Sequence, residues 1–172
     1  MIKQHCAYVG LGSNLDQPLI QLQRAVAAMA QLTLSSLDGA SKVYQSRPQG
    51  PAGQPDYMNA AVRLTTELAP HALLVALQAI ETSQGRTRDV RWGPRTLDLD
   101  LLLYDDLVLD TEDLVIPHPQ LTRRSFVLLP LMDIDAHLAL PNDLPIATAL
   151  AATGTEDLEF FATSGQLCQA CS

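Results

Sequence analysis

A run in which leucine and aspartate alternate, from Leu97 to Leu101, constrains the fold of this chain more than any other feature. Successive side chains on a β-strand point to opposite faces, so the leucines are expected on one face and Asp98 and Asp100 on the other. The leucines can enter a hydrophobic core. The two carboxylates, roughly 6–7 Å apart on strand geometry, repel each other unless water, arginine or a divalent cation lies between them. The run therefore predicts a half-buried strand that carries a pair of acids.

Strands and helices are expected around this acidic strand. Apolar residues spaced by three and four predict two helices, which begin at Pro18 and Pro70 because proline suits the first turn of a helix. In chain order we expect a strand at 7–11, a helix at 18–31, a strand near 41–46, a strand within 56–68, a helix from 70 to a stop at Gly85, and the acidic strand. This βαββαβ order is ferredoxin-like. It predicts an α+β fold, with a mainly antiparallel sheet, helices packed on it and C-terminal additions.

The end of the acidic strand is expected to keep the alternation. Leu102 and Tyr104 should therefore lie on the same face as the acids. A turn at residues 105–106 and a short return strand at 107–110 should follow.

The C-terminal part of the chain is expected to be less regular. A loop enters a helix that Pro130 ends or kinks. A short helix from about Pro145 then leads into a loosely ordered stretch. These features predict a single domain over residues 1–160 and a loosely ordered tail over residues 161–172.

Composition excludes several classes of partner. A formal net charge of −8 disfavours nucleic-acid binding, which normally needs a basic surface. No apolar run approaches the roughly 20 residues that span a bilayer, and the first residues lack the pattern of a signal peptide, so a cytoplasmic protein without a membrane partner is expected. The odd number of cysteines, 3, argues against a disulfide framework, and the terminal CQAC is interpreted as a mobile tail in preference to a zinc site.

The segment GLGSNL, with Gly10 and Gly12, has some of the glycines of a phosphate-binding loop but does not match a known type. It lacks the third glycine of a dinucleotide fingerprint and the Lys-Ser/Thr pair of a Walker loop. The preferred interpretation is therefore a tight turn after the first strand.

Arginines next to the acidic strand indicate which kind of chemistry the two acids could carry out. Four of them fall within a stretch of ten positions just before the acids: Arg86, Arg88, Arg91 and Arg95. Mg²⁺ usually takes one or two carboxylates together with substrate phosphates, and arginine binds phosphate oxygens through paired hydrogen bonds. The pattern favours polyphosphate transfer. An edge strand with solvated acids, or an Asp–Arg ion-pair network, remains the simpler alternative.

Several motifs together resemble the 6-hydroxymethyl-7,8-dihydropterin pyrophosphokinases. They are YVGLGSNL (8–15), GQPDYMNAAV (53–62), IETSQGR (80–86), RWGPRTLDLDLLLYDD (91–106) and IPHPQLTRRSFVLLPL (116–131). The resemblance implies transfer of a pyrophosphoryl group from ATP to the hydroxymethyl oxygen of 6-hydroxymethyl-7,8-dihydropterin, release of AMP, and two Mg²⁺ ions on the triphosphate. It also implies that loops 46–55 and 85–94 close over the substrates.

The resemblance also implies roles for individual residues. Asp98 and Asp100 match the metal ligands, and with Arg86 and Arg95 they form the implied catalytic set. The implied nucleotide contacts are Leu74, Gln78, Arg88, Trp92, Leu101, His118 and Arg124. The implied pterin contacts are Ser46, Tyr57, Asn59, Trp92 and Phe126, with Trp92 and Phe126 sandwiching the ring. Glu81 is expected to be structural or to orient an arginine.

Two other functions remain open from the sequence. A nucleotidyltransferase with a palm-like carboxylate pair would release pyrophosphate in place of AMP. A non-enzymatic ferredoxin-like binding module would consume no ATP. A monomer is expected, since the chain shows no heptad repeat and no obvious apolar interface.

Overall fold

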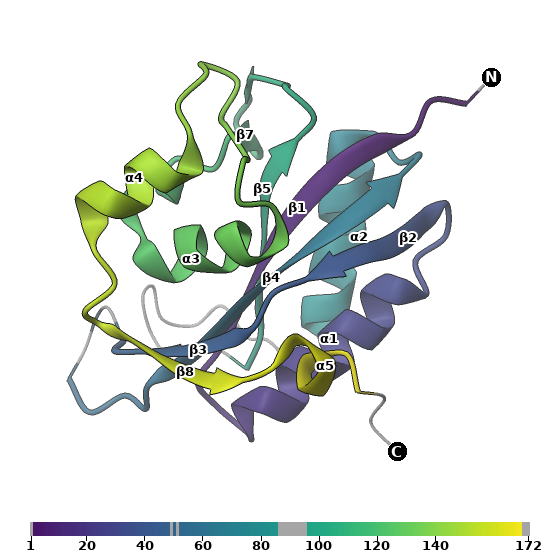
Figure 1. The fold of residues 1–172 in the computed structure, drawn as a ribbon. Coiled ribbons are helices and arrows are strands. Elements are labelled where there is room, and N and C mark those ends of the chain that lie inside the picture. Colours follow the sequence, from purple (N-terminus) through teal and green to yellow (C-terminus); the bar gives the residue numbers. More distant parts are fainter. Residues whose placement is uncertain (1, 49, 51, 86–95, 170–172) are drawn as a thin grey trace.

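The structure is a computed structural model that describes residues 2–48, 50, 52–85 and 96–169. Helices lie on both faces of an antiparallel sheet (Figure 1). In chain order the elements are β1 (His5–Ser13), α1 (Pro18–Ala30), β2 (Ser35–Ala40), β3 (Val43–Ser46), β4 (Tyr57–Thr66), α2 (Pro70–Ser83), β5 (Asp98–Tyr104), β6 (Leu109–Asp110), β7 (Val115–Ile116), the 3-10 turn η1 (Leu121–Arg123), α3 (Ser125–Ile134), α4 (Ile146–Thr153), β8 (Leu158–Ala162) and α5 (Ser164–Leu167).

The main sheet has the strand order β5-β1-β4-β3-β8, and β2 also pairs with β4. These pairings are antiparallel. Helices α1 and α2 cover one face, and α3 and α4 lie over the other (Figure 1). The expected mixed fold of helices on an antiparallel sheet is confirmed.

Each face of the sheet has its own hydrophobic core, and the strand alternation decides which residues enter which core. Ala60, Val62 and Leu64 of β4 pack with the side chains of α1 and α2, while Ala61 packs with those of α3 and α4. The leucines of the acidic run, at 97, 99 and 101, all enter the first core. The predicted faces of residues 97–101 are therefore confirmed, and Asp98 and Asp100 lie on the face that α3 covers.

A β-bulge in β5 overturns one of the predicted positions. Val9 pairs with Leu101 and Tyr8 pairs with Leu103, so Leu102 is an extra residue without a direct partner. Leu102 lies on the acidic face as predicted, but the extra residue reverses the alternation beyond it. Tyr104 therefore enters the α1/α2 core, contrary to the prediction. Its hydroxyl donates to the carbonyl of Leu68 at 2.6 Å.

Three local expectations also differ from the structure. The return strand is only Leu109–Asp110, and it pairs with β7 in a separate two-stranded sheet. Pro130 lies inside α3 and does not end it, so of the two expectations, an end or a kink, the first is wrong. The helix continues to Ile134 because its packing against β4 and α4 outweighs the local cost of proline. Gly10 and Gly12 do not form a turn. They lie within β1, where both pair with strands on either side.

The C-terminal segment is more ordered than predicted through residue 167. β8 pairs with β3 at the edge of the sheet. A capping box between Thr163 and Gln166 begins α5, and Leu167 is completely buried in the α1/α2 core. The expectation of a loosely ordered tail is therefore wrong for residues 161–167. The sequence does not show this helix, because one buried leucine and one capping box give no periodic pattern.

Replacing Leu167 with alanine is expected to lower the free energy of unfolding by about 2–3 kcal/mol, the usual cost of truncating a buried leucine. Urea unfolding followed by circular dichroism measures the change. The exposed Gln169, replaced by alanine, is the control and should leave stability unchanged. Equal stability of the Leu167 variant and the unmodified chain would contradict the packing of α5 on α1.

Candidate active site

The register of three strands places the predicted metal and pterin residues on one face of the sheet. Gly12 of β1 pairs with Asn59 of β4 on one side and with Asp98 of β5 on the other. Directly paired residues point to the same face. Adjacent strands lie about 4.8 Å apart, so the Asn59 and Asp98 backbones are about 10 Å apart across Gly12. The site therefore has an amide at one end, a carboxylate at the other and a glycine between them.

The two aspartates are partly exposed on the α3 face of the sheet. Asp98 and Asp100 are half-buried and lie on the face where their partners in β1 are Gly12 and Gly10. No side chain of β1 therefore projects next to either carboxylate. Among the described residues, no group of three or more histidine, cysteine or acidic side chains could hold a metal by itself. Two carboxylates fit Mg²⁺ when phosphate oxygens complete its ligands.

A buried acid holds the backbone between these two aspartates. β5 is an edge strand, with β1 on one side only. Glu81 of α2 is 3% exposed, and its Oε2 accepts a hydrogen bond from the backbone N–H of Leu99 at 2.9 Å. The helix thus supplies the acceptor for an N–H at the edge of the sheet. Glu81 was expected to be structural or to orient an arginine, and its contact with Leu99 is a structural one.

The amide of Asn59 is oriented by the strands around it. Its Nδ2 donates to Ser46 Oγ at 2.8 Å and to the carbonyl of Tyr44 at 3.2 Å. Oδ1 lies on the side of Gly12, 3.8 Å from the place where a Cβ of that glycine would be. Tyr57, two residues earlier, lies on the same face and is half-buried. Ser46 and Tyr44 therefore fix the orientation of this buried amide, with its oxygen on the side of Gly12.

His118, Arg124 and Phe126 form a second group on the acidic face. The backbone N–H of His118 donates to the Leu102 carbonyl at 3.0 Å, which attaches this segment to β5. Nδ1 of His118 accepts from the backbone N–H of Gln120 at 3.1 Å, so in the neutral ring the proton is on Nε2. The Arg124 guanidinium lies 5.6 Å from the centre of the Phe126 ring. The group offers an imidazole N–H, a cation and an aromatic face.

Burial, and secondarily the positive charge of Arg124, lowers the pKa of His118, while Asp98 opposes the shift. Between this lowered pKa and the ordinary value near 6.5 the unfolded chain binds more protons than the folded one. Stability should therefore decrease as pH falls from 7.5 to 5.5. Urea unfolding at these two pH values should show a smaller loss for His118→Asn than for the unmodified chain. Parallel pH dependence of the two proteins would contradict a neutral, half-buried His118.

The three residues implied to contact the nucleotide from α2 and β5 occupy different environments. Leu74 and Gln78 are half-buried and share a helix face with Glu81. Gln78 lies about one turn before Glu81, and Leu74 about two turns before it. That face lies along β5, where Glu81 binds Leu99. Leu101 is 3% exposed and belongs to the core between the sheet and α1/α2. A nucleotide could therefore reach the main chain of Leu101 but not its side chain.

Two adjacent residues that the sequence did not single out attach flanking segments to the end of β1. Ser13 Oγ donates to the carbonyl of Thr96 at 2.5 Å. Nδ2 of the buried Asn14 donates to the carbonyl of Pro55 at 3.0 Å and to Gln54 Oε1 at 3.3 Å. Pro55 is the last residue of the predicted loop 46–55, and Thr96 follows the predicted loop 85–94 by two residues. Polar residues directly after a buried strand were the available signal, but they were interpreted as part of a turn.

Four of the predicted site residues lie outside the part of the chain that the structure describes. Residues 86–95 lie outside the described residues, and they include the implied contacts Arg86, Arg88, Trp92 and Arg95. The terminal Cys171 also lies outside them. The described residues bring together Ser46, Tyr57, Asn59, Asp98, Asp100, His118, Arg124 and Phe126 on one face of the sheet.

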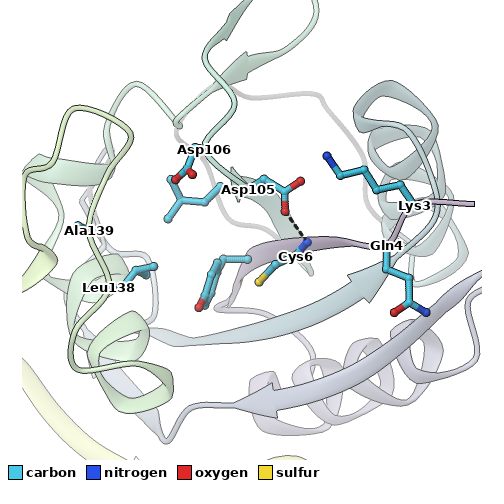
Figure 2. A pocket seen from close by; sticks show the side chains of 9 residues that line it. Lys3, Gln4, Cys6, Asp105, Asp106, Leu138 and Ala139 are labelled. Carbon is cyan, nitrogen blue, oxygen red and sulfur yellow. Dashed lines mark hydrogen bonds between the residues drawn. The ribbon is translucent and has the colours of Figure 1, made fainter.

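A surface cavity of about 450 Å³ lies elsewhere, at the opposite end of β1 (Figure 2). Cys6, Asp105 and Asp106 line it, and the backbone N–H of Cys6 donates to Asp105 at 2.8 Å. Cys6 and Gly12 are six residues apart on one strand, or about 20 Å. The cavity is therefore separate from the acidic pair. Burial raises the pKa of the Cys6 thiol, so its reactivity as a thiolate is reduced.

Comparison with known proteins identifies the family. The family model described as 7,8-dihydro-6-hydroxymethylpterin-pyrophosphokinase (HPPK) matches residues 8–136. The chain belongs to the HPPK family. The matched residues span every site position described above, from Gly12 to Phe126, and end before α4, β8 and α5.

Two relatives carry the name 2-amino-4-hydroxy-6-hydroxymethyldihydropteridine pyrophosphokinase. The protein of Haemophilus influenzae is 50% identical over 136 residues, which are 79% of this chain and 85% of the relative. The protein of Pseudomonas aeruginosa is 49% identical over 152 residues, which are 88% of this chain and 94% of the relative. The predicted family and its pyrophosphokinase activity are thus confirmed at the level of the family.

Solved structures agree with this chain in fold. A crystal structure of Plasmodium falciparum HPPK-DHPS, wild type with pteroate, matches at a TM-score of 0.74 over 92% of this HPPK chain. This chain spans 48% of that chain, with 13% sequence identity, so the likeness concerns the fold alone. No helix among the described residues is both long enough and apolar enough to cross a membrane.

Proposed function

We propose that this HPPK-family chain transfers the pyrophosphoryl group of ATP to the hydroxymethyl group of 6-hydroxymethyl-7,8-dihydropterin, and releases AMP, in folate biosynthesis. The observation that carries the proposal is the row Asn59, Gly12 and Asp98, which places an oriented amide and a half-buried carboxylate on one face, in a chain that is 50% identical to a pyrophosphokinase. An amide can recognise the pterin edge, and a carboxylate can hold a metal on the triphosphate.

In this proposal Asp98 and Asp100 are the ligands of two Mg²⁺ ions, together with phosphate oxygens of ATP. When bound, Mg²⁺ neutralises charge that develops on the phosphoryl oxygens. The two carboxylates fix the position of the triphosphate relative to the sheet. Their half-buried location limits competition from water for the same oxygens.

The pterin is proposed to lie at the other end of the row. Asn59 Oδ1 accepts an N–H of the heterocycle, while the bond from Nδ2 to Ser46 keeps that oxygen in place. Tyr57 and Phe126 are half-buried aromatic residues on the same face, and flat rings stack on a flat heterocycle. Trp92 is proposed as a further stacking residue on the basis of the family resemblance.

The nucleotide is proposed to bind along β5 and the segment that follows it. His118 donates from Nε2 to a phosphate oxygen, because Gln120 occupies Nδ1. Arg124 supplies positive charge beside it. Leu74, Gln78 and the main chain of Leu101 line the base and ribose, and the arginines at 86, 88 and 95 are proposed as further phosphate contacts, with Arg86 and Arg95 catalytic.

Other properties are proposed with the function. The strand order β5-β1-β4-β3, with β2 beside β4, supports a ferredoxin-like core if β2 and β3 count as one interrupted strand. We propose a single domain that acts as a cytoplasmic monomer and has no nucleic-acid partner. The net charge of −8 supports the last point.

Incubation of the chain with MgATP and 6-hydroxymethyl-7,8-dihydropterin tests the function directly. The expected products are AMP and the pterin diphosphate in equal amounts, separated by anion-exchange chromatography. Release of pyrophosphate in place of AMP would favour the nucleotidyltransferase. No consumption of ATP would exclude both activities.

A further inference from the structure

Gly10 and Gly12 of the segment GLG pair with the two aspartates in the site, but neither glycine has a part in substrate binding in the proposed function. Both glycines lie within β1, where glycine weakens the sheet and often marks a close approach of a ligand or another backbone. The positive-φ glycines of the described residues are Gly50, Gly53, Gly85 and Gly154. Neither Gly10 nor Gly12 is among them, so backbone conformation does not require glycine at either position.

The two glycines differ in what would surround a side chain. A Cβ on Gly10 would meet Leu102 Cδ1 at 3.3 Å, which is a tight contact with a buried core residue. Leu102 therefore fills the space above Gly10. A Cβ on Gly12 would meet no described atom closer than 3.7 Å, the distance to Tyr57 Cδ1. The described protein atoms thus leave room for a side chain at residue 12.

The free space at residue 12 lies between the two halves of the proposed site. The nearest described atoms to the missing Cβ belong to Tyr57, Asn59 and Met58, at 3.7, 3.8 and 4.0 Å. Tyr57 and Asn59 are the proposed pterin contacts. On the other side, Gly12 pairs with Asp98, the proposed metal ligand. When the pterin ring binds at Asn59 and its hydroxymethyl group reaches the phosphates held at Asp98, the substrate has to lie over Gly12.

We propose that Gly12 is a specificity-determining position, at which the absence of a side chain admits the flat pterin and its hydroxymethyl arm between Asn59 and Asp98. This inference rests on the proposed function. A methyl group at residue 12 would occupy the surface on which the ring lies while fitting the folded protein. The substitution should therefore weaken pterin binding without weakening the fold or the binding of nucleotide.

The experiment compares Gly12→Ala and Gly12→Val with the unmodified chain. Isothermal titration measures the affinity for 6-hydroxymethyl-7,8-dihydropterin in the presence of Mg²⁺ and α,β-methylene-ATP, which cannot release AMP. Gly12→Ala should lose at least tenfold in pterin affinity, and Gly12→Val should lose more. Affinity for the Mg²⁺–nucleotide should stay within threefold, and the melting temperature of Gly12→Ala should not fall.

Gly10→Ala is the matched control on the same strand and face. Its methyl group meets Leu102 in the core, so its melting temperature should change while its pterin affinity stays within threefold. Equal loss of pterin affinity in the Gly10 and Gly12 variants, or unchanged affinity in Gly12→Ala, would overturn the proposal and leave the proposed function standing. Failure of the unmodified chain to bind the pterin or form AMP would overturn the proposed function, and the inference with it.

Discussion

Replacing either Asp98 or Asp100 with alanine is expected to reduce AMP formation by at least about a thousandfold while the chain stays folded. A metal contributes several kcal/mol to stabilising charge on a transferring phosphoryl group, and about 4 kcal/mol corresponds to a thousandfold in rate. Both side chains are half-buried and lie outside the two hydrophobic cores, so their loss leaves no cavity in the core. Single-turnover assays with saturating MgATP measure the effect.

Two sets of variants separate metal binding from a general loss of charge. Asp98→Asn and Asp100→Asn keep the shape but remove the charge, and they should be almost as inactive as the alanine variants. Asp110→Ala removes an exposed acid in β6 and should keep normal turnover. Circular dichroism confirms that each variant is folded. Near-normal turnover in the Asp98 and Asp100 variants would remove both residues from the proposed metal site.

The sequence was sufficient where one strand carries the pattern by itself. Alternation placed Asp98 and Asp100 on one face and Leu99 in the core without any knowledge of the neighbouring strands. The same alternation puts Asn59 and Tyr57 on one face of β4. These positions are local consequences of strand geometry, and the structure agrees with each of them.

Features that depend on a second strand could not be predicted in this way. Tyr104 changes face because the pairing of β5 with β1 includes an extra residue, and nothing in the local sequence marks the bulge. From the sequence Gly12 resembles a turn residue. Its place between Asn59 and Asp98 depends on pairing with two other strands, which the local sequence does not show. The partners of Ser13 and Asn14 are 83 and 41 residues away along the chain. Only the folded chain brings these residues together.

Glu81 illustrates how a non-local contact can control the site. Its carboxylate is almost completely buried, and the N–H that it accepts belongs to Leu99, between the two aspartates. Burial of a carboxylate is unfavourable unless hydrogen bonds compensate for the lost hydration. Because β5 is an edge strand, β1 can fix only one of its sides. Glu81 binds the other side at Leu99, and we expect this bond to help hold Asp98 and Asp100 in place beside β1.

Glu81→Ala is expected to lower the free energy of unfolding by about 2–3 kcal/mol, because the Leu99 N–H loses its acceptor at a buried site. It should also raise the Mg²⁺ concentration needed for half-maximal AMP formation by at least tenfold, since the two aspartates are no longer held in register. Thermal unfolding and a Mg²⁺ titration of the initial rate measure the two effects.

Glu81→Gln distinguishes the hydrogen bond from the charge. The amide oxygen can still accept from Leu99, so this variant should recover most of the stability and the Mg²⁺ dependence that the alanine variant loses. Glu159→Ala, at an exposed position of β8, controls for loss of an acid and should change stability by less than about 0.5 kcal/mol. A Glu81→Ala variant that is less stable but keeps normal Mg²⁺ dependence would limit Glu81 to the fold. If glutamine is as damaging as alanine, the charge of Glu81, and not its bond to Leu99, sets the position of the acidic strand.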